Sequence, residues 1–183
     1  MPRLIVLNGP PACGKSTLAR LYADDHPLTL NLDIDRLRGL LGAWRENAAK
    51  AGTLARDLAV SAARTHLLAG HDVIVPQFLG RADLLERLET LAGETAAEFH
   101  EIVLLDTKDN VLRRFAERTR AAAEPEHVEA HEMLGGPERL AEMYDRLVAL
   151  IATRPKAVVV WTSAGRIQQA YQGLLDSLAP DRF

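Results

Sequence analysis

The chain has 183 residues, of which 48% are hydrophobic and 26% charged, enough for the core of one domain and too short for two. Its net charge of −3 argues against a protein that follows long nucleic acids by bulk electrostatic attraction, and no apolar run approaches the roughly 20 residues of a membrane span. The single cysteine, Cys13, excludes an internal disulfide. Together with an N-terminus that lacks the pattern of a signal peptide, it favours a cytoplasmic protein.

Short apolar runs alternate with amphipathic stretches, an order typical of a mostly parallel sheet with helices on its faces. The runs are rich in Val, Ile and Leu, which suits strands buried on both sides. We therefore expect one α/β domain over residues 1–183 with a five-stranded parallel sheet. In chain order, the patterns predict strand 4–7, helix 15–23, strand 28–32, a short helix and mobile loop within 39–53, helix 54–68, strand 73–75, helix 82–91, strand 102–105, helices 110–120 and 138–152, strand 157–161 and helix 167–178.

A complete G-x-x-x-x-G-K-S motif links the first predicted strand to the first predicted helix. Gly9 and Gly14 let the backbone curl, so that successive N–H groups converge on an anion at the positive helix end. Lys15 is placed to reach the β- and γ-phosphates, and the Ser16 hydroxyl to help hold Mg²⁺. Cys13 is interpreted as a small side chain turned away from the phosphates rather than a reactive thiol. The motif predicts that ATP or GTP binds through Gly9, Ala12, Cys13, Gly14, Lys15, Ser16 and Thr17.

Two aspartates and an arginine follow the second predicted strand: Asp33, Asp35 and Arg38. Ligands of parallel α/β sheets bind beyond the carboxyl ends of the strands, which places Asp35 near the terminal phosphate if the strands are neighbours. Asp35 could accept the proton of a substrate hydroxyl, and Arg38 could pair with it or grip the transferred phosphoryl group. The alternative for Asp35 is a simple N-cap. Two roles remain open for Asp33: it orients a magnesium-bound water, or it faces solvent.

The order of the P-loop and the N-x-x-x-D-x-x-R element over residues 31–38 resembles the kinase domain of bacteriophage-type polynucleotide kinases. More broadly, it resembles the small P-loop kinases grouped with zeta toxins and chloramphenicol phosphotransferase. The likeness extends over most of the chain, since residues 73–75 match the third strand, 111–118 look like an arginine-bearing lid and 138–147 resemble the helix after it. This resemblance implies a P-loop NTPase-type three-layer sandwich with a lid at about 113–136.

The same resemblance implies roles for individual side chains. Asp35 becomes the general base, and Arg38 contacts the acceptor and the transferring phosphate. Lys15 and Ser16 hold the donor. Two arginines of the lid, Arg114 and Arg118, close over the donor phosphates. Arg118 is also counted among the catalytic residues.

Gln77 marks a departure from the polynucleotide kinases, which carry an acidic residue just after the third strand. Because an amide can hydrogen-bond a hydroxyl but cannot balance the charge of an arginine, Gln77 argues against a polynucleotide 5′-hydroxyl acceptor. Gln77 and Arg81 are candidates for contacting the acceptor. Trp44 and Arg45 are candidates for stacking on it and gripping it, with simple packing as the alternative for Trp44.

Further candidates lie in the second half of the chain. Arg114 and Arg118 are spaced i, i+4 and share a helix face, which suits cations that neutralise developing charge and exclude water; a solvated face is the alternative. Asp106 ends the fourth predicted strand, where it either binds magnesium or only leads to the lid helix. His127 and His131 lack a third ligand in the pattern, so a metal site there is disfavoured.

The leading hypothesis is a kinase that uses ATP or GTP with Mg²⁺ to phosphorylate a hydroxyl of a small molecule, such as a nucleoside-like compound or antibiotic. Only three lysines accompany Lys15, and no basic stripe with interleaved aromatics is present, so a polynucleotide 5′-hydroxyl kinase is the alternative. A nucleotide switch module is a second class, although no D-x-x-G or N-K-x-D motif occurs. A toxin kinase acting on a cell-wall sugar nucleotide is a third possibility. The loop after the fifth predicted strand, residues 162–166, is expected to lie against the purine base of the nucleotide.

Overall fold

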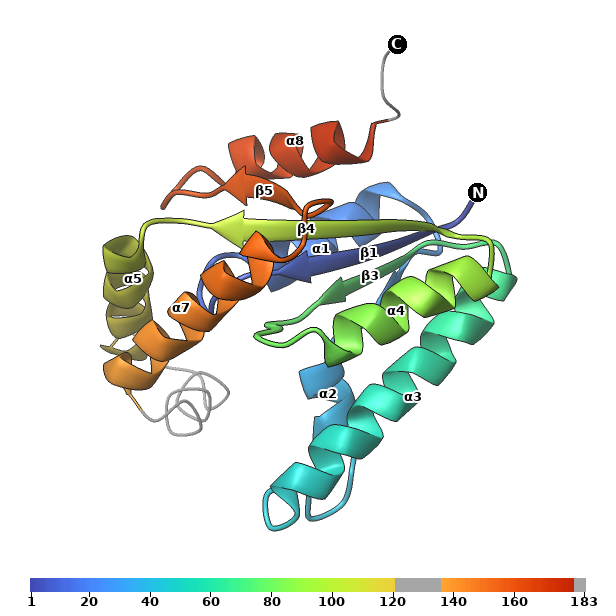
Figure 1. Ribbon diagram of the computed structural model, residues 1–183, viewed down its shortest axis with the longest axis horizontal. Coiled ribbons are helices and arrows are strands. Elements are labelled where there is room, and N and C mark those ends of the chain that lie inside the picture. The colour runs from blue at the N-terminus through green and yellow to red at the C-terminus, as the bar shows by residue number, and fades with distance from the viewer. Residues whose placement is uncertain (121–135, 180–183) are drawn as a thin grey trace.

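The computed structural model describes residues 1–120 and 136–179, with the backbone alone for residues 118–120 (Figure 1). Within these ranges, no helix is long and apolar enough to cross a membrane. Strands and helices alternate along most of the chain. In order they are β1 (Arg3–Asn8), α1 (Lys15–Asp25), β2 (Leu30–Asn31), α2 (Ile34–Gly39), α3 (Ala48–Leu68), β3 (Val73–Pro76), α4 (Asp83–Glu94), β4 (Glu98–Leu105), α5 (Lys108–Arg120), α7 (Pro137–Ala152), β5 (Val158–Trp161) and α8 (Ile167–Leu178).

The strands form one parallel sheet in the order β2-β3-β1-β4-β5, which confirms the predicted five-stranded parallel sheet. Strand β1 lies at the centre, with Leu4 opposite Val73 of β3 and Arg3 opposite Glu98 of β4. Strand β3 separates β1 from β2. On this side of β1, the loop after β3 rather than the end of β2 therefore lies next to the P-loop, and the first two strands are not the neighbours that the sequence argument for Asp35 assumed.

Helices cover both faces of the sheet and complete three layers. Alternate residues of β1 point to opposite faces: Leu4 and Val6 pack among side chains of α3 and α4, whereas Ile5 and Leu7 pack among side chains of α1 and α8. Leu147 of α7 packs in one cluster with Val103 and Leu105 from the second half of β4. Figure 1 shows α4 and α7 in front of the sheet and α1 behind it. Because the strands are parallel, their carboxyl ends all lie at the same end of the sheet, which is where ligands bind in such folds.

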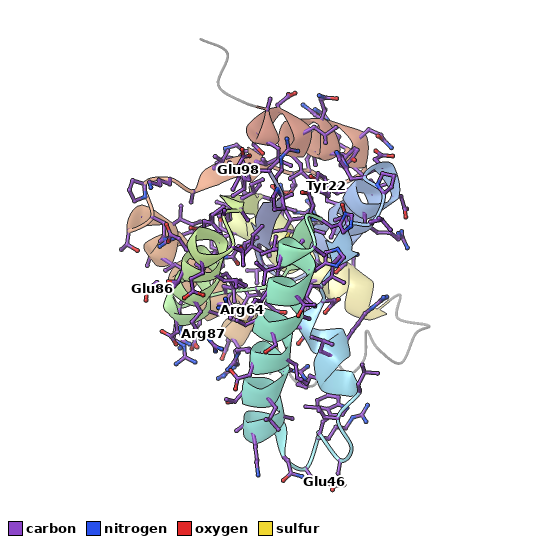
Figure 2. All side chains as sticks on the ribbon, turned by 90° about the vertical axis from the view of Figure 1, so that its right-hand side faces the viewer. Tyr22, Glu46, Arg64, Glu86, Arg87 and Glu98 are labelled. Carbon is purple, nitrogen blue, oxygen red and sulfur yellow. The ribbon has the colours of Figure 1, made fainter. Side chains whose placement is uncertain are left out.

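A helical hairpin of α2 and α3 projects away from the sheet on the side of β2, with Glu46 at its tip (Figure 2). The predicted short helix and loop at 39–53 are wrong in detail, because α2 ends at Gly39 and α3 begins at Ala48 rather than at residue 54. The inner face of α3 is a stripe of four alanines followed by one leucine, all with i, i+4 spacing. Alanine favours helix strongly, but it gives a weak amphipathic signal. The stripe comprises Ala51, Ala55, Ala59, Ala63 and Leu67.

Two strands differ from their predicted lengths by three residues or more, and the others by one or two. Strand β2 has only two residues, and its predicted first residue, Leu28, has a left-handed φ of 66° that is incompatible with extended backbone. Strand β4 begins four residues before the apolar run. Its polar first half pairs with β1, and the carboxylate of Glu101 there receives a hydrogen bond from Arg154 at 2.7 Å. An ion pair therefore supports a strand segment that hydrophobic patterning misses.

Candidate nucleotide and acceptor site

The P-loop has a backbone that requires glycine at both ends of the motif. Gly9 has a φ of 150°, and a Cβ there would lie 2.6 Å from the carbonyl oxygen of Leu104. Gly14 has a φ of 96° and caps α1 through its backbone, without a side-chain hydrogen bond. The first N–H groups of α1 are therefore left for an anion, at the positive end of the helix dipole.

The side chains of the loop have distinct environments. The Lys15 ammonium donates to the carbonyl oxygens of Gly9 and Pro10, both at 2.8 Å, which holds it across the loop. Cys13 is buried against the α1 side of the sheet, as expected for a small packing residue. Ser16 is exposed at the start of α1, so its hydroxyl is available to a Mg²⁺ ion held with nucleotide phosphates.

A cavity of about 540 Å³ adjoins the P-loop. It brings the predicted donor residues Ala12, Cys13, Gly14, Thr17 and Arg114 together with the loop between β5 and α8. Thr162 anchors that loop, since its N–H donates to the carbonyl oxygen of Leu105 at 2.7 Å. The segment 162–166 therefore lines the same cavity as the P-loop, and its contact with a purine stays a prediction.

A charged pair at the end of β4 supports this cavity. The Arg114 guanidinium lies 2.7 Å from the carboxylate of Asp106, and both side chains are largely buried. Asp106 also accepts from the Asn110 amide at 2.8 Å and from the Thr107 N–H at 2.7 Å. Because its carboxylate is engaged in this way, Asp106 orients Arg114, whose Nε is buried without a described partner. The side chain of Arg118 lies outside the described residues.

The predictions of an arginine lid and of a magnesium ligand are not tested by the described residues. Residues 121–135, with His127 and His131, lie outside the described part of the chain, so the arginine lid stays a prediction. Among the described side chains, no group of three or more His, Cys, Asp or Glu residues gathers around one point. Ser16 as a magnesium ligand therefore stays a prediction from the motif.

The two aspartates at the start of α2, whose roles the sequence left open, have different environments. Asp33 is the N-cap, and its carboxylate accepts from the N–H groups of Asp35 at 2.9 Å and Arg36 at 3.2 Å. Burial raises the pKa of Asp33, and these backbone hydrogen bonds oppose that rise. Asp35 is not the cap. Its side chain is instead more than half exposed, beyond the first residue of the helix.

Asp35 faces a cationic partner. The guanidinium of Arg38 lies 3.1 Å from its carboxylate, one turn along α2. The guanidinium groups of Arg38 and Arg45 both lie over the Trp44 ring, with 4.7 Å from each guanidinium carbon to the ring centroid. Of these residues, Asp35 and Arg38 line the cavity described next, whereas Trp44 packs behind Arg38. The structure thus places Trp44 and Arg45 outside that cavity, where the ring orders Arg38.

A second cavity, of about 560 Å³, lies between the α2–α3 hairpin, the loop after β3 and α7. It brings together four of the predicted acceptor residues, Asp35, Arg38, Gln77 and Arg81. The Oε1 atom of Gln77 and the Nε atom of Arg38 are buried without a described hydrogen-bond partner. Such atoms are costly unless a ligand or water satisfies them. The remaining lining residues are Ile34, Gly52, Ala55, Arg56, Phe78, Leu79, Gly80, Asp83, Leu84, Arg87, Arg139, Glu142, Met143 and Arg146.

Asn8 joins this cavity to the P-loop. Its fully buried amide oxygen accepts from the N–H groups of Gly9 and Leu79, each at 2.8 Å. Its NH₂ group donates to the carbonyl oxygen of Leu79 at 2.9 Å. One side chain therefore fixes the first residue of the P-loop against the wall of the second cavity.

Several lining residues were missed by sequence reasoning. Four of them lie on one face of α7 at i, i+3, i+4 and i+7: Arg139, Glu142, Met143 and Arg146. This spacing is visible in the sequence and could have singled out a polar helix face. Arg56 had no comparable signal, because it follows Gly52 and Ala55 on a helix segment with weak amphipathic character.

Several solved structures share this architecture. A candidate kinase from Chloroflexus aurantiacus aligns with a TM-score of 0.63 and 22% identity over 97% of this chain and 96% of that chain. A tunicamycin resistance protein from Deinococcus radiodurans aligns with a TM-score of 0.62 and 16% identity, over 98% and 96%. A gluconokinase from Sinorhizobium meliloti gives a TM-score of 0.60 and 17% identity, over 96% and 93%. These similarities establish the fold.

The family comparison covers most of the chain. No curated protein matches the sequence. A family model described as an AAA domain, AAA_33, matches residues 4–143, a range that includes the P-loop, Asp35 and most of the second cavity. The chain therefore belongs to the AAA_33 family and has a kinase-like P-loop fold.

Proposed function

We propose that this protein is a kinase that transfers the γ-phosphoryl group of ATP or GTP to a hydroxyl group of a small molecule. The observation that carries the proposal is the second cavity beside the P-loop. It contains a carboxylate, Asp35, and it is fixed to the P-loop through Asn8. A protein that only hydrolyses or senses a nucleotide has no need for a separate acceptor cavity of this kind.

The donor binds first through backbone geometry. The N–H groups at the start of α1 and the curled P-loop receive the phosphates, and Lys15 moves from the carbonyl oxygens of Gly9 and Pro10 to the phosphate oxygens. Arg114, held by Asp106, faces the same cavity. Ser16 would hold a Mg²⁺ ion, which supplies positive charge to the phosphate oxygens when it is bound.

The transfer step then uses the second cavity, the one lined by Asp35 and Arg38, which we call the acceptor cavity. The acceptor hydroxyl gives its proton to the carboxylate of Asp35 while its oxygen forms a bond to the γ-phosphorus. The bond between that phosphorus and the β–γ bridging oxygen breaks, and the nucleoside diphosphate leaves with the electron pair. Arg38 neutralises charge on the moving phosphoryl group. The Gln77 amide oxygen, buried without a described partner, accepts from a hydroxyl of the acceptor.

A small acceptor is the favoured class. A volume of about 560 Å³ lies within the usual range for small-molecule sites. Two structural neighbours are named for small molecules, the gluconokinase and the tunicamycin resistance protein. Their names support a small hydroxyl compound, including an antibiotic, as the acceptor. The narrower resemblance to polynucleotide kinases and the chloramphenicol phosphotransferase group makes a polynucleotide 5′-hydroxyl the alternative.

The proposal is tested by acceptor-dependent phosphoryl transfer. Purified protein is incubated with γ-labelled ATP or GTP and Mg²⁺, with and without pools of sugars, sugar acids, nucleosides, nucleoside antibiotics and a 5′-hydroxyl oligonucleotide. The expected result is label on a small hydroxyl compound. Label on the oligonucleotide alone would establish the alternative acceptor, and release of free phosphate at a rate that no pool changes would contradict a kinase.

A further inference from the structure

We infer that the acceptor carries a negatively charged group, a carboxylate or a phosphate, in addition to the hydroxyl that is phosphorylated. This inference rests on the proposed kinase function and names the class of its acceptor. The group is bound by three arginines from three different elements of the acceptor cavity. They are Arg56 of α3, Arg81 of the loop after β3 and Arg139 of α7.

The cavity is strongly positive although the chain is acidic. Its described lining contains six arginines against three carboxylates, whereas the whole chain has a net charge of −3. Like charges that converge on one concave site repel each other unless an anion compensates them. The sign of this cavity is therefore a local property, set by the side chains of α2, α3, the loop after β3, α4 and α7.

Half of these arginines have partners. Arg87 lies 2.7 Å from the carboxylate of Asp57 and is labelled on α4 in Figure 2. Arg38 lies 3.1 Å from Asp35. Arg146 pairs more loosely along α7, with Glu142 at 3.8 Å.

The other half, Arg56, Arg81 and Arg139, make no ion pair within the described part of the chain. An exposed arginine is commonly only solvated. These three differ from a solvated helix face because they come from separate elements and line the same cavity.

The donor phosphates do not account for these cations. The cavity that adjoins the P-loop and the acceptor cavity have no described lining residue in common, and the former is lined by Arg114. Arg38, next to Asp35, suits the transferring phosphoryl group. Three guanidinium groups then remain for the acceptor itself. Guanidinium groups bind carboxylate and phosphate oxygens in a bidentate manner, and both anions are therefore tested.

The first experiment compares matched acceptors with γ-labelled ATP and Mg²⁺. The pairs are gluconate with glucitol, glycerol 3-phosphate with glycerol, and a nucleoside 3′-monophosphate with its nucleoside; a 5′-hydroxyl oligonucleotide forms a separate arm. The expected result is that the acidic member of at least one pair has a kcat/KM at least 100-fold above that of its neutral member. The pair that responds distinguishes a carboxylate from a phosphate. Equal labelling of neutral members, or labelling of the oligonucleotide alone, would overturn the inference.

Three single variants and one control assign the effect to the cavity. Arg56→Gln, Arg81→Gln and Arg139→Gln are each expected to raise KM for the acidic acceptor about tenfold, the effect of removing one charge-assisted contact. Labelling of any neutral acceptor should change little. Arg20→Gln removes the same charge from an exposed position on α1, on the other side of the sheet, and should leave KM unchanged. An equal effect of all four variants would overturn the inference.

A binding measurement separates this inference from the kinase proposal when no compound is labelled. Inorganic phosphate is titrated into protein saturated with a non-hydrolysable ATP analogue and Mg²⁺, so that the donor site is filled. Phosphate binding that is at least tenfold weaker in the triple variant R56Q/R81Q/R139Q would support the anion site, although the kinase proposal would lack its acceptor. Absence of binding to the parent protein, or equal binding to both proteins, would overturn the anion site.

Discussion

The carboxylate of Asp35 lies 3.1 Å from the guanidinium of Arg38, and both side chains line the acceptor cavity. The N-cap of their helix belongs to Asp33 instead. A carboxylate that has no capping role, and faces a cavity beside a cation, is available for chemistry. Because the pair is partly exposed, its contribution to stability is small, so replacing Asp35 tests its proposed catalytic role without a large change in stability.

The two neighbouring aspartates should separate stability from activity. Asp33→Ala removes the side chain that accepts from two N–H groups of α2 and should lower the free energy of unfolding by about 1 kcal/mol. Asp35→Ala should change it by less than about 0.5 kcal/mol. Urea denaturation of both variants measures the difference. A larger loss for Asp35→Ala would mean that this carboxylate has a structural role.

Asn8→Ala should disconnect the P-loop from the acceptor cavity. The substitution leaves the N–H groups of Gly9 and Leu79 unsatisfied in a fully buried place, which should lower the free energy of unfolding by about 3 kcal/mol. Asn47→Ala is the control, since Asn47 is exposed and donates to one carbonyl oxygen, and its cost should stay below about 1 kcal/mol. Equal costs in chemical denaturation would contradict the role assigned to Asn8.

Lys15→Ala tests the phosphate cradle directly. Loss of one charge-assisted contact to the phosphates should weaken ATP binding in the presence of Mg²⁺ by about 10- to 100-fold. The rise in melting temperature that ATP causes should shrink accordingly. Lys50→Ala, at an exposed position near the start of α3, should bind ATP as the parent does. Calorimetric titration of both variants with ATP would refute the assignment if their affinities were alike.

His100 should make stability depend on pH. Burial lowers the pKa of His100, and its partner Glu98 opposes that shift only in part. Because the unfolded chain then binds a proton more readily than the folded chain, the free energy of unfolding should fall as the pH drops through about 6.5. His100→Gln removes this contribution, so denaturant unfolding at pH 7.5 and pH 5.5 should show a smaller decrease in the variant. Equal decreases in both proteins would exclude His100 as a cause.

Much of the fold could be predicted because it depends on local patterns. The apolar runs of buried parallel strands, the P-loop glycines and the Pro137 helix start all act over a few residues. Strand order, in contrast, is a property of packing across the sheet, and periodicity does not encode it. The alanine stripe of α3 was underestimated for a related reason, because small residues pack closely while contributing little hydrophobic signal.

The candidate site divides in the same way. Gly9 and Lys15 belong to a contiguous motif that any reader of the sequence can find. The acceptor cavity is assembled from segments far apart in the chain, so Arg56 had no local pattern to mark it, and the helix-face spacing of Arg139 did not by itself indicate a cavity. Asn8 is similar, since its partner Leu79 is 71 residues away. Trp44 was chosen for its chemistry, and its packing on Arg38 depends on the turn of the hairpin.

The most direct test of the central claim is the rate of phosphoryl transfer by Asp35→Asn at saturating ATP, Mg²⁺ and acceptor. The substitution retains the size of the side chain and removes its basicity. Loss of a general base should lower kcat by about 10²- to 10⁴-fold, with ATP affinity and the free energy of unfolding close to those of the parent. A kcat equal to that of the parent protein would contradict the assignment of Asp35 as the base and, with it, the proposed use of the acceptor cavity.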